Sequence, residues 1–542
     1  MIAAALGIDV GTTNVKAAVV EGGRRPRVVA RGAAPHPSAQ PRPGWVEQSP
    51  EAWWRATVAA VRACGDALGR VRAVGVSGQG STFAACDATG RPLGAAIGWQ
   101  DLRATAEAAE IDRRLRPALD RAHGNRIGDA PEPKLLWLLR HRPAALEGAA
   151  AVLTAAAVVG ARLGGAPVVN EGDAGAFLSW DRHRRAWAEE VTAPLGLLDL
   201  LPAVVAPGER IGAVGDRAAA ETGVPEGALV VASTTDVGAA AVAAGAARAN
   251  VAFYSKGTGG FLCCHVPSVG DPGELLALPL GIGGLVQLCA GTDTLGAAYD
   301  WCRALLGVRS HRRAERLARA APPGAGGLVL LPWLQGAHHP ILEPAATGVL
   351  AGLTVETDAG NLLRAVLEGT AIMLRWNLRA ARRVTGLEFD RVVSSGGPTR
   401  CTLWNRVDAA AAEVPVVVAA GSDAAVGSAL IAGAAVGLWD DPIEVGARLR
   451  RPRRFDPDPE LVAAMRELDR RSRMVADALL PLFGRLARLA VGAVTGDGTP
   501  GDRYRRGSGV PPLQGARPGR AEGTEPVPRV SGFPTTSRER PD

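Results

Sequence analysis

The sequence predicts an α/β protein built from two similar domains. Short apolar strands alternate with helical segments along its 542 residues, and an apolar share of 47% is ample for large cores. A strand, a Gly-Thr turn and a returning strand open the chain at residues 3–20, and the same unit recurs at residues 251–266, about 245 residues later. Such a repeat indicates two related domains that face each other across a bound phosphate.

The opening hairpin carries the residues around which the rest of the chain is organised. Residues 3–10 are apolar, as expected of a buried strand, and Asp9 near their end would need a partner once buried. Gly11-Thr12-Thr13 forms the turn, and the second strand begins at Lys16. A glycine lets a ligand approach the backbone, turn N–H groups and threonine hydroxyls can hold phosphate oxygens, and a carboxylate can hold Mg²⁺. The alternative is an ordinary hairpin with a polar turn.

A polar, glycine-rich loop follows the next predicted strand, at residues 71–76. The loop covers residues 77–82 and includes Gln79 and Gly80. It stands at the carboxyl end of a strand, which is where α/β sheets bind their ligands.

Trp99, Asp101 and Arg103 occupy alternate positions in a segment that reads as extended, so we expect their side chains to point the same way. An aromatic face beside a carboxylate and a guanidinium suits a polyhydroxy ligand. The alternative is a helix N-terminus with a solvent-exposed salt bridge.

Asp236 stands where a predicted strand at residues 228–232 meets a helix of small residues at 239–247. A carboxylate at such a junction suits a general base. The alternative is that Asp236 only caps the helix.

The second turn reads Ser255-Lys256-Gly257-Thr258-Gly259-Gly260. The chain has only three lysines, and two of them, Lys16 and Lys256, lie in the two turns. Strand alternation leaves two orientations for Lys256, outward or toward the phosphate. A later strand at residues 391–395 ends in Gly396 and Gly397, which could accept the flat face of a base because they carry no side chain.

The remaining elements and the tail follow from local pattern. Glycine, proline, serine and arginine dominate from Gly492 onward without periodicity, which predicts a disordered tail. The other expected elements are a third strand over 24–31, a strand over 415–419, a mostly helical stretch over 104–225, and helices over 50–68, 360–385, 401–412, 424–437 and 461–489.

Composition argues against several classes of protein. The net charge of +7 is spread along the chain, so we expect no nucleic-acid partner. Seven cysteines without a CxxC pair favour a reducing cytoplasm. We expect no signal peptide before the first strand and no membrane span, because no apolar stretch is long enough. The sequence leaves open whether the protein forms a homodimer.

Taken together, these motifs resemble those of the FGGY family of carbohydrate kinases, with xylulokinases the nearest in pattern. The resemblance covers about residues 4–490 and rests on several motifs in the expected order. These motifs are Gly7 to Thr13, Pro43 to Gln48, Ser77 to Gln79, Trp99 to Arg103, Ser255 to Gly259, Leu331 to Trp333, Gly348 to Leu353, Arg364 to Gly369, and Gly396-Gly397.

The family implies two actin-like, ribonuclease H-like ATPase domains with ATP and Mg²⁺ in the cleft between them. Residues 1–242 would form the sugar-binding domain, residues 243–490 the nucleotide-binding domain, and residues 491–542 a disordered tail. The activity implied is transfer of the γ-phosphate of ATP to a hydroxyl of a sugar, a pentulose such as xylulose in the first place.

The resemblance also implies a role for individual residues. Asp236 would take the proton from the sugar hydroxyl, and Asp9 would help to hold Mg²⁺. The nucleotide would contact Gly11, Thr12, Thr13, Lys16, Gly257, Thr258, Gly259, Gly396 and Gly397. The sugar pocket would be shaped by Gln79, Gly80, Trp99, Asp101 and Arg103, together with Asp236.

Several positions depart from the family pattern. Xylulokinases usually have Met-His where Gly80-Ser81 stands here, which admits other ketoses or polyols as the substrate. Lys256 and Gly259 replace an apolar residue and a serine of the second phosphate turn, and Pro398-Thr399 replaces a glycine and an alanine. His338-His339 could be taken for metal ligands, but adjacent loop histidines without a third partner are more often solvent-exposed or hydrogen-bonding groups.

Two further hypotheses remain beside the sugar kinase. One is a non-catalytic or regulatory relative that binds nucleotide or sugar, which the presence of Asp9 and Asp236 argues against. The other is an actin-fold ATPase of chaperone or polymer type, which has no need of the polyol-binding residues Trp99, Asp101 and Arg103.

Overall fold

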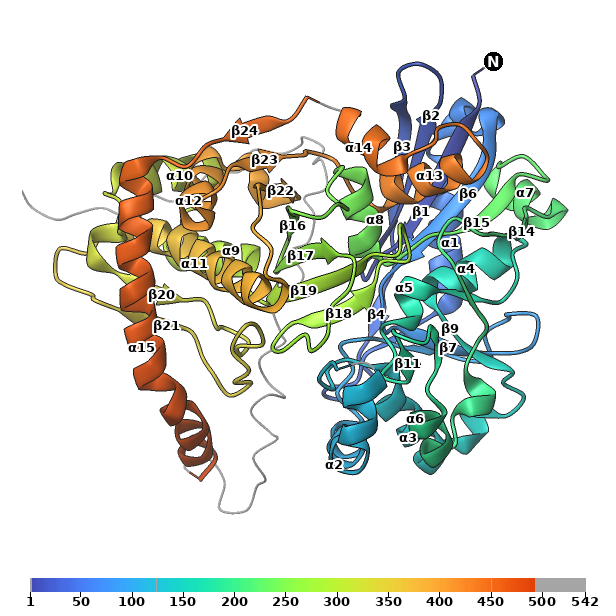
Figure 1. The fold of residues 1–542 in the computed structure, drawn as a ribbon, viewed down its shortest axis with the longest axis horizontal. Coiled ribbons are helices and arrows are strands. Elements are labelled where there is room, and N and C mark those ends of the chain that lie inside the picture. The colour runs from blue at the N-terminus through green and yellow to red at the C-terminus, as the bar shows by residue number, and fades with distance from the viewer. Residues whose placement is uncertain (1, 123, 450, 493–542) are drawn as a thin grey trace, which may run out of the picture.

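The computed structural model describes residues 2–122, 124–449 and 451–492, and two large β-sheets organise it (Figure 1). Strands within the first 232 residues form one sheet, and strands between residues 251 and 455 form the other. None of the helices in these ranges combines the length and hydropathy needed to cross a bilayer. The tail was expected at 491–542, but the last described helix, α15 (Pro459–Gly492), includes its first two residues, and residues 493–542 lie outside the described residues.

The N-terminal sheet has the strand order β14-β15-β6-β1-β2-β3. The strand β1 forms an antiparallel hairpin with β2 and runs parallel to β6, which runs parallel to β15. These strands are β1 (Ala4–Val10), β2 (Asn14–Glu21), β3 (Arg27–Pro35), β6 (Val71–Gly78), β14 (Arg210–Ala213) and β15 (Leu229–Ala232).

The C-terminal sheet repeats this pattern of strand pairing, with the order β18-β19-β17-β16-β22-β23-β24. The strand β17 pairs antiparallel with β16 and β19, and β16, β22 and β23 run parallel. The internal repeat predicted from the two Gly-Thr turns is therefore confirmed. The strands are β16 (Val251–Lys256), β17 (Gly260–Val266), β18 (Leu276–Pro279), β19 (Val286–Thr292), β22 (Arg391–Ser395), β23 (Val416–Val418) and β24 (Arg453–Phe455).

Two helices of small residues, α8 (Asp236–Ala243) and α13 (Ala424–Ala435), join the two halves (Figure 1). The helix α13 belongs to the second half of the chain, yet it packs against β1 and β6 of the first sheet and against α8. A Cβ added to Gly427 would lie 1.8 Å from the carbonyl oxygen of Ala239, and one added to Gly7 would lie 1.8 Å from that of Ala425. Glycines thus allow backbone-to-backbone contact in this layer.

The region expected to be mostly helical, residues 104–225, is in fact mixed. It adds one strand to a small second sheet of order β4-β5-β8-β7-β9 and contains short strand pairs between its helices. The elements around this sheet are β4 (Ser38–Ala39), β5 (Glu47–Gln48), β7 (Phe83–Cys86), β8 (Ala96–Ile97), β9 (Ala151–Thr154), β10 (Val169–Asn170), β11 (Trp180–Asp181), β12 (Ala186–Trp187), β13 (Val204–Val205), α1 (Pro50–Arg62), α2 (Thr105–Ala122), α3 (Pro131–His141), α4 (Ala155–Leu163), α5 (Glu171–Ala174), α6 (Glu189–Thr192) and α7 (Asp216–Thr222).

Two local expectations need correction. The first helix ends at Arg62 rather than residue 68, because Gly65 has a φ of 57° and the chain continues as a 3₁₀ helix over Gly65–Arg70. The segment of Trp99 to Arg103 is a series of turns and not an extended strand.

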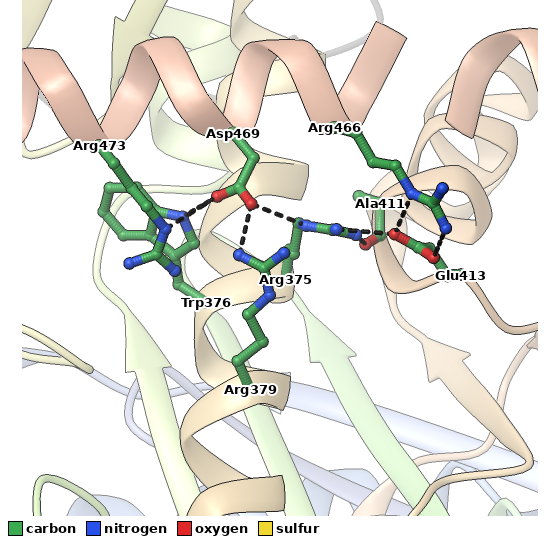
Figure 2. Close-up of polar contacts among 8 residues, drawn as sticks. All are labelled: Arg375, Trp376, Arg379, Ala411, Glu413, Arg466, Asp469 and Arg473. Carbon is green, nitrogen blue, oxygen red and sulfur yellow. Dashed lines mark hydrogen bonds and ion pairs between the residues drawn. The ribbon is translucent and has the colours of Figure 1, made fainter. Parts of the chain in front are cut away.

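Helices cover the C-terminal sheet, and the last of them, α15 (Pro459–Gly492), is held by a network of charges (Figure 2). Asp469 of α15 accepts hydrogen bonds from Arg375 Nε at 3.1 Å, from Trp376 Nε1 at 2.6 Å and from Arg379. Arg375 also pairs with Glu413 at 2.7 Å. The other elements here are α9 (Gly296–Leu305), α10 (His311–Ala320), β20 (Val329–Leu331), β21 (Val349–Ala351), α11 (Ala359–Thr385), α12 (Thr402–Ala412) and α14 (Pro442–Arg448).

Candidate active site

Asp9 is a buried carboxylate at the end of β1, between β2 and β6. Its side chain packs beside Lys16 of β2, with 3.9 Å between Oδ2 and Nζ, while Oδ1 is buried without a hydrogen-bond partner among the described residues. Burial, followed by the negative charge of Asp236, raises the pKa of Asp9 to about 7. An orphaned, poorly solvated oxygen of this kind is suited to a cation.

Asp236 lies in the first turn of α8, close enough to Asp9 for their charges to interact. The N-cap is Thr235, whose hydroxyl accepts from the N–H of Gly238 at 3.0 Å. The alternative that Asp236 itself caps the helix is therefore wrong. Burial raises the pKa of Asp236 to about 6, although a hydrogen bond from the N–H of Val237 acts to lower that pKa. A carboxylate in this range can be ionised at neutral pH and still accept a proton.

Two further carboxylates belong to this cluster, and neither was predicted from the sequence. Asp173 is buried, its Oδ2 accepts from Thr154 Oγ1 at 2.8 Å, and burial followed by the charge of Asp236 raises its pKa to about 7. Asp423 caps α13, pairs with Arg31 at 2.5 Å, and contributes to the raised pKa of Asp9. The N-cap pattern before α13 was a usable signal for Asp423, whereas Asp173 gave none.

A hydrogen-bonded network of glutamines joins the first Gly-Thr turn to the loop of residues 77–82. Gln48 Oε1 accepts from Gln79 Nε2 at 2.7 Å and from Trp53 Nε1 at 2.8 Å, and Gln48 Nε2 donates to the carbonyl of Thr12 at 3.2 Å. Gln79 Oε1 accepts from Thr82 Oγ1 at 3.2 Å. Gln79 is therefore buried and fully engaged in holding two loops together.

Trp99 lies at the junction of the same two loops and keeps an exposed face. Its indole Nε1 donates to Thr12 Oγ1 at 3.2 Å, its N–H donates to Thr82 Oγ1 at 3.0 Å, and its carbonyl accepts from Lys134 Nζ at 2.9 Å. The residue stays 38% exposed. Gly80, in the neighbouring loop, is only partly buried, so both positions are accessible from solvent.

Asp101 and Arg103 do not point with Trp99 toward open space. Arg103 is bidentate on Asp101, with contacts of 2.8 Å, reaches Glu47 at 2.8 Å, and stacks on Trp45 at 3.9 Å. The two side chains are almost fully buried. They tie this segment to residues 45–47 and do not face a ligand with Trp99, because the turns at residues 99–103 break the alternation that the sequence predicted.

The second Gly-Thr turn is open to solvent at the end of β16. Gly257 and Thr258 are exposed, and Gly259 is half-buried. The carbonyls of Gly257 and Thr258 accept from the N–H groups of Gly296 and Ala297, at 3.1 and 2.9 Å, which fixes the turn from behind.

Lys256 takes neither orientation that the sequence left open, since it points into the domain and pairs with Asp408 at 2.5 Å. Gly396 and Gly397 are both exposed beyond β22. A Cβ on Gly396, whose φ is 102°, would lie 1.9 Å from the carbonyl oxygen of Lys256, so only glycine fits there.

The residues present fit Mg²⁺ only in part. In the described ranges, no group of three His, Cys, Asp or Glu side chains is arranged to hold a metal ion. The orphaned Oδ1 of Asp9, beside the charges of Asp236 and Asp423, fits as one ligand, because a cation there would offset their repulsion. Mg²⁺ commonly takes one or two carboxylates and fills its shell with water and phosphate oxygens. His338 pairs instead with Asp293 at 2.6 Å.

The duplicated sheets and the layer between them define a two-domain protein of the actin-like, ribonuclease H-like architecture. Residues 4–243 match the N-terminal domain, and residues 252–436 the C-terminal domain, of the FGGY family of carbohydrate kinases. The chain belongs to this family, so the resemblance seen in its motifs is confirmed.

Similar proteins include both xylulose kinases and glycerol kinases. The chain is 32% identical to the xylulose kinase of Streptomyces rubiginosus, over 89% of this chain and 97% of that one. It is equally 32% identical to the glycerol kinase of Dechloromonas aromatica, over 87% and 95%. The crystal structure of xylulose kinase from Rhodospirillum rubrum superposes with a TM-score of 0.80 at 28% identity, over 89% and 100% of the two chains.

Proposed function

We propose that this protein is an ATP-dependent kinase that transfers the γ-phosphoryl group to a hydroxyl of a sugar, with a pentulose such as xylulose as the first candidate. The observation that carries the proposal is the pair Asp236 and Asp9, two carboxylates from different elements that lie together where the two halves of the chain meet. In this assignment Asp236 is the general base, and Asp9 would hold Mg²⁺.

The nucleotide would lie across both domains. Gly11-Thr12-Thr13 would contact phosphates from one side and Gly257-Thr258-Gly259 from the other, with adenine at Gly396-Gly397. Lys16 has half of its side chain exposed and stands 3.9 Å from Asp9, so its ammonium group can reach a phosphate oxygen without leaving the site. Bound Mg²⁺ supplies neutralisation of the phosphate charge.

Asp236 accepts the proton of the attacking hydroxyl in this proposal. A general base is most effective when its pKa lies near the working pH, so that it is mostly ionised yet as basic as that allows, and a pKa of about 6 meets that condition at neutral pH. Phosphoryl transfer needs little more than this orientation and charge stabilisation. The reaction is thus within reach of the residues described.

The sugar would lie against Trp99 and Gly80, while Gln79, Asp101 and Arg103 support the loops that present them. A kinase of glycerol or another small polyol is the second candidate. The equal identity to glycerol kinases favours it, as does the small Gly80-Ser81 pair in the sugar loop. Since ATP is its co-substrate and its seven cysteines are free in the fold, we place the enzyme in the cytoplasm.

The test is ADP release with Mg²⁺ and ATP over a panel of ketoses and polyols that includes xylulose, ribulose and glycerol. We expect one acceptor to stimulate turnover in the wild type, and Asp236→Asn to lower kcat by about 10²–10⁴-fold with ATP binding retained. Asp112→Asn, an exposed carboxylate on α2, is the matched control. Stimulation that survives Asp236→Asn would show that another group is the base, and no stimulation by any acceptor would favour a regulatory relative.

A further inference from the structure

The second phosphate turn and the proposed adenine loop are joined beneath the surface by a closed ring of contacts. Both segments follow the carboxyl ends of neighbouring parallel strands, since Ser255 of β16 is paired in register with Ser395 of β22. Nothing in that pairing alone fixes how the turn after one strand sits relative to the loop after the other. Lys256, between the strand and the turn, makes the connection.

The connection begins with a buried ion pair. Lys256 Nζ lies 2.5 Å from Asp408 Oδ2, and the two side chains are 0% and 1% exposed. The ammonium group also lies 4.4 Å from the ring centre of Trp404, which shields it from solvent on another side. Asp408 and Trp404 both belong to α12, the helix that follows the adenine loop.

The same helix returns to the loop through hydrogen bonds. Asn405, buried one turn before Asp408, donates from Nδ2 to the carbonyl of Thr399 at 2.8 Å. Thr399 Oγ1 donates to the carbonyl of Gly396 at 2.6 Å. Gly396 in turn packs so closely on the backbone of Lys256 that a Cβ there would lie 1.9 Å from the lysine carbonyl. The ring is therefore closed through Lys256, Asp408, Asn405, Thr399 and Gly396.

We propose that Lys256 and Asp408 are positioning residues that set the triphosphate subsite at the correct distance and angle from the adenine subsite. The inference rests on the proposed function, because it takes the two segments to bind the two ends of one ATP molecule. Neither side chain touches the ligand. A directional pair in a low-dielectric interior fixes geometry in a way that apolar packing of the same volume does not.

The proposal predicts a specific pattern of binding defects. A ligand that spans both subsites needs their registration, whereas a ligand that fills one subsite does not. In Lys256→Met we expect Kd for ATP to rise about tenfold, with Kd for adenosine alone and for tripolyphosphate alone within about twofold of the wild type. KM for ATP should rise in parallel, while KM for the sugar and kcat stay within about threefold.

Two further variants separate positioning from stability. Lys256→Met leaves Asp408 buried and unpaired, so it can unfold the domain for reasons of its own. The double variant Lys256→Met/Asp408→Leu removes both charges at similar volume, and we expect it to recover thermal stability but to keep the raised Kd for ATP. The matched control is Arg364→Met/Glu368→Leu, which removes another buried pair, of 2.6 Å, within α11. It should leave ATP binding unchanged.

The measurement is calorimetric titration of the full chain with ATP and MgCl₂, and saturation-transfer NMR for adenosine and tripolyphosphate. Wild-type ATP affinity in the double variant would overturn the proposal, as would equal weakening of all three ligands. A wild type that binds none of the three would reject the proposed function and this inference together, whereas tight wild-type binding with an insensitive double variant rejects the inference alone.

Discussion

The acidic residues of the site are held in an unusual electrostatic state. Asp9, Asp173 and Asp236 come from three different elements, and all three have a pKa raised above its ordinary value, in each case chiefly by burial. Repulsion among them adds to the effect at Asp9 and Asp173. Such a cluster destabilises the ligand-free fold and becomes favourable only when a cation or a proton joins it, so it is better explained by chemistry than by stability.

The pH dependence of turnover reports on Asp236. A general base must be ionised, so kcat/KM for the sugar should fall about tenfold for each pH unit below about 6, the pKa to which burial raises Asp236. The measurement is kcat/KM between pH 5 and 8. A flat profile over that range would contradict the assignment, and the acid limb should be absent from the residual activity of Asp236→Asn.

The stability of the ligand-free protein reports on Asp9. Because its folded pKa is raised from 3.8 to about 7, the folded state binds the proton more tightly than the unfolded state, and stability is lost as pH rises through that window. Asp9→Asn should therefore raise the free energy of unfolding by about 1–3 kcal/mol at pH 8, with little gain at pH 4, while abolishing turnover. Thermal unfolding at both pH values decides this, and equal effects at the two would count against it.

At the scale of elements, the layer of α8 and α13 depends on glycines that no helix propensity would favour. Gly427→Ala should cost about 2–4 kcal/mol, because its Cβ would fall 1.8 Å from the carbonyl oxygen of Ala239 and one helix would have to move. Gly94→Ala is the control, since nothing lies within 4 Å of the added Cβ. Chemical denaturation of both variants tests the difference, and equal stabilities would contradict the close packing.

The attachment of helix α15 gives a second prediction about the stability of an element. Asp469 is buried against Arg375, Arg379 and Trp376 (Figure 2), so Asp469→Asn should lower the free energy of unfolding by about 2–4 kcal/mol. Asp477→Asn, exposed on the same helix, should change it by less than about 0.5 kcal/mol. Urea unfolding of the two variants is the measurement, and a neutral Asp469→Asn would mean that α15 is held by apolar contacts alone.

For the whole molecule, the two halves share one buried cluster in addition to a separate core in each half. A single buried cluster includes Ala5 and Val231 of the first sheet, Phe253 and Val393 of the second, and α8 and α13 between them. We therefore expect residues 1–242 expressed alone not to fold cooperatively, because α13, at Ala424–Ala435, would be missing from the face of β1 and β6. Circular dichroism melting of the fragment is the test, and a cooperative transition like that of the full chain would show that the halves fold separately.

Short-range patterns in the sequence were enough to predict much of the local structure. Both hairpins, their Gly-Thr turns and the position of Asp236 at a strand-to-helix junction follow from short-range patterns, because a strand, a tight turn and a cap are each decided within a few residues. The duplicated arrangement also followed, since the same local unit appears twice. Short-range patterns therefore predicted Asp9 and Asp236 as residues of one site. The structure brings the two carboxylates close enough for their charges to interact, and their roles stay predictions.

Only the tertiary structure decided what each polar side chain faces. Asp101 and Arg103 bind each other and Glu47, and Lys256 turns inward to a residue 152 positions away. Asp173 joins the carboxylates from a segment without any motif. Burial and pairing depend on elements brought together from distant parts of the chain. A sequence fixes which groups are available, whereas the packing of the two domains determines which of them remain free for a ligand.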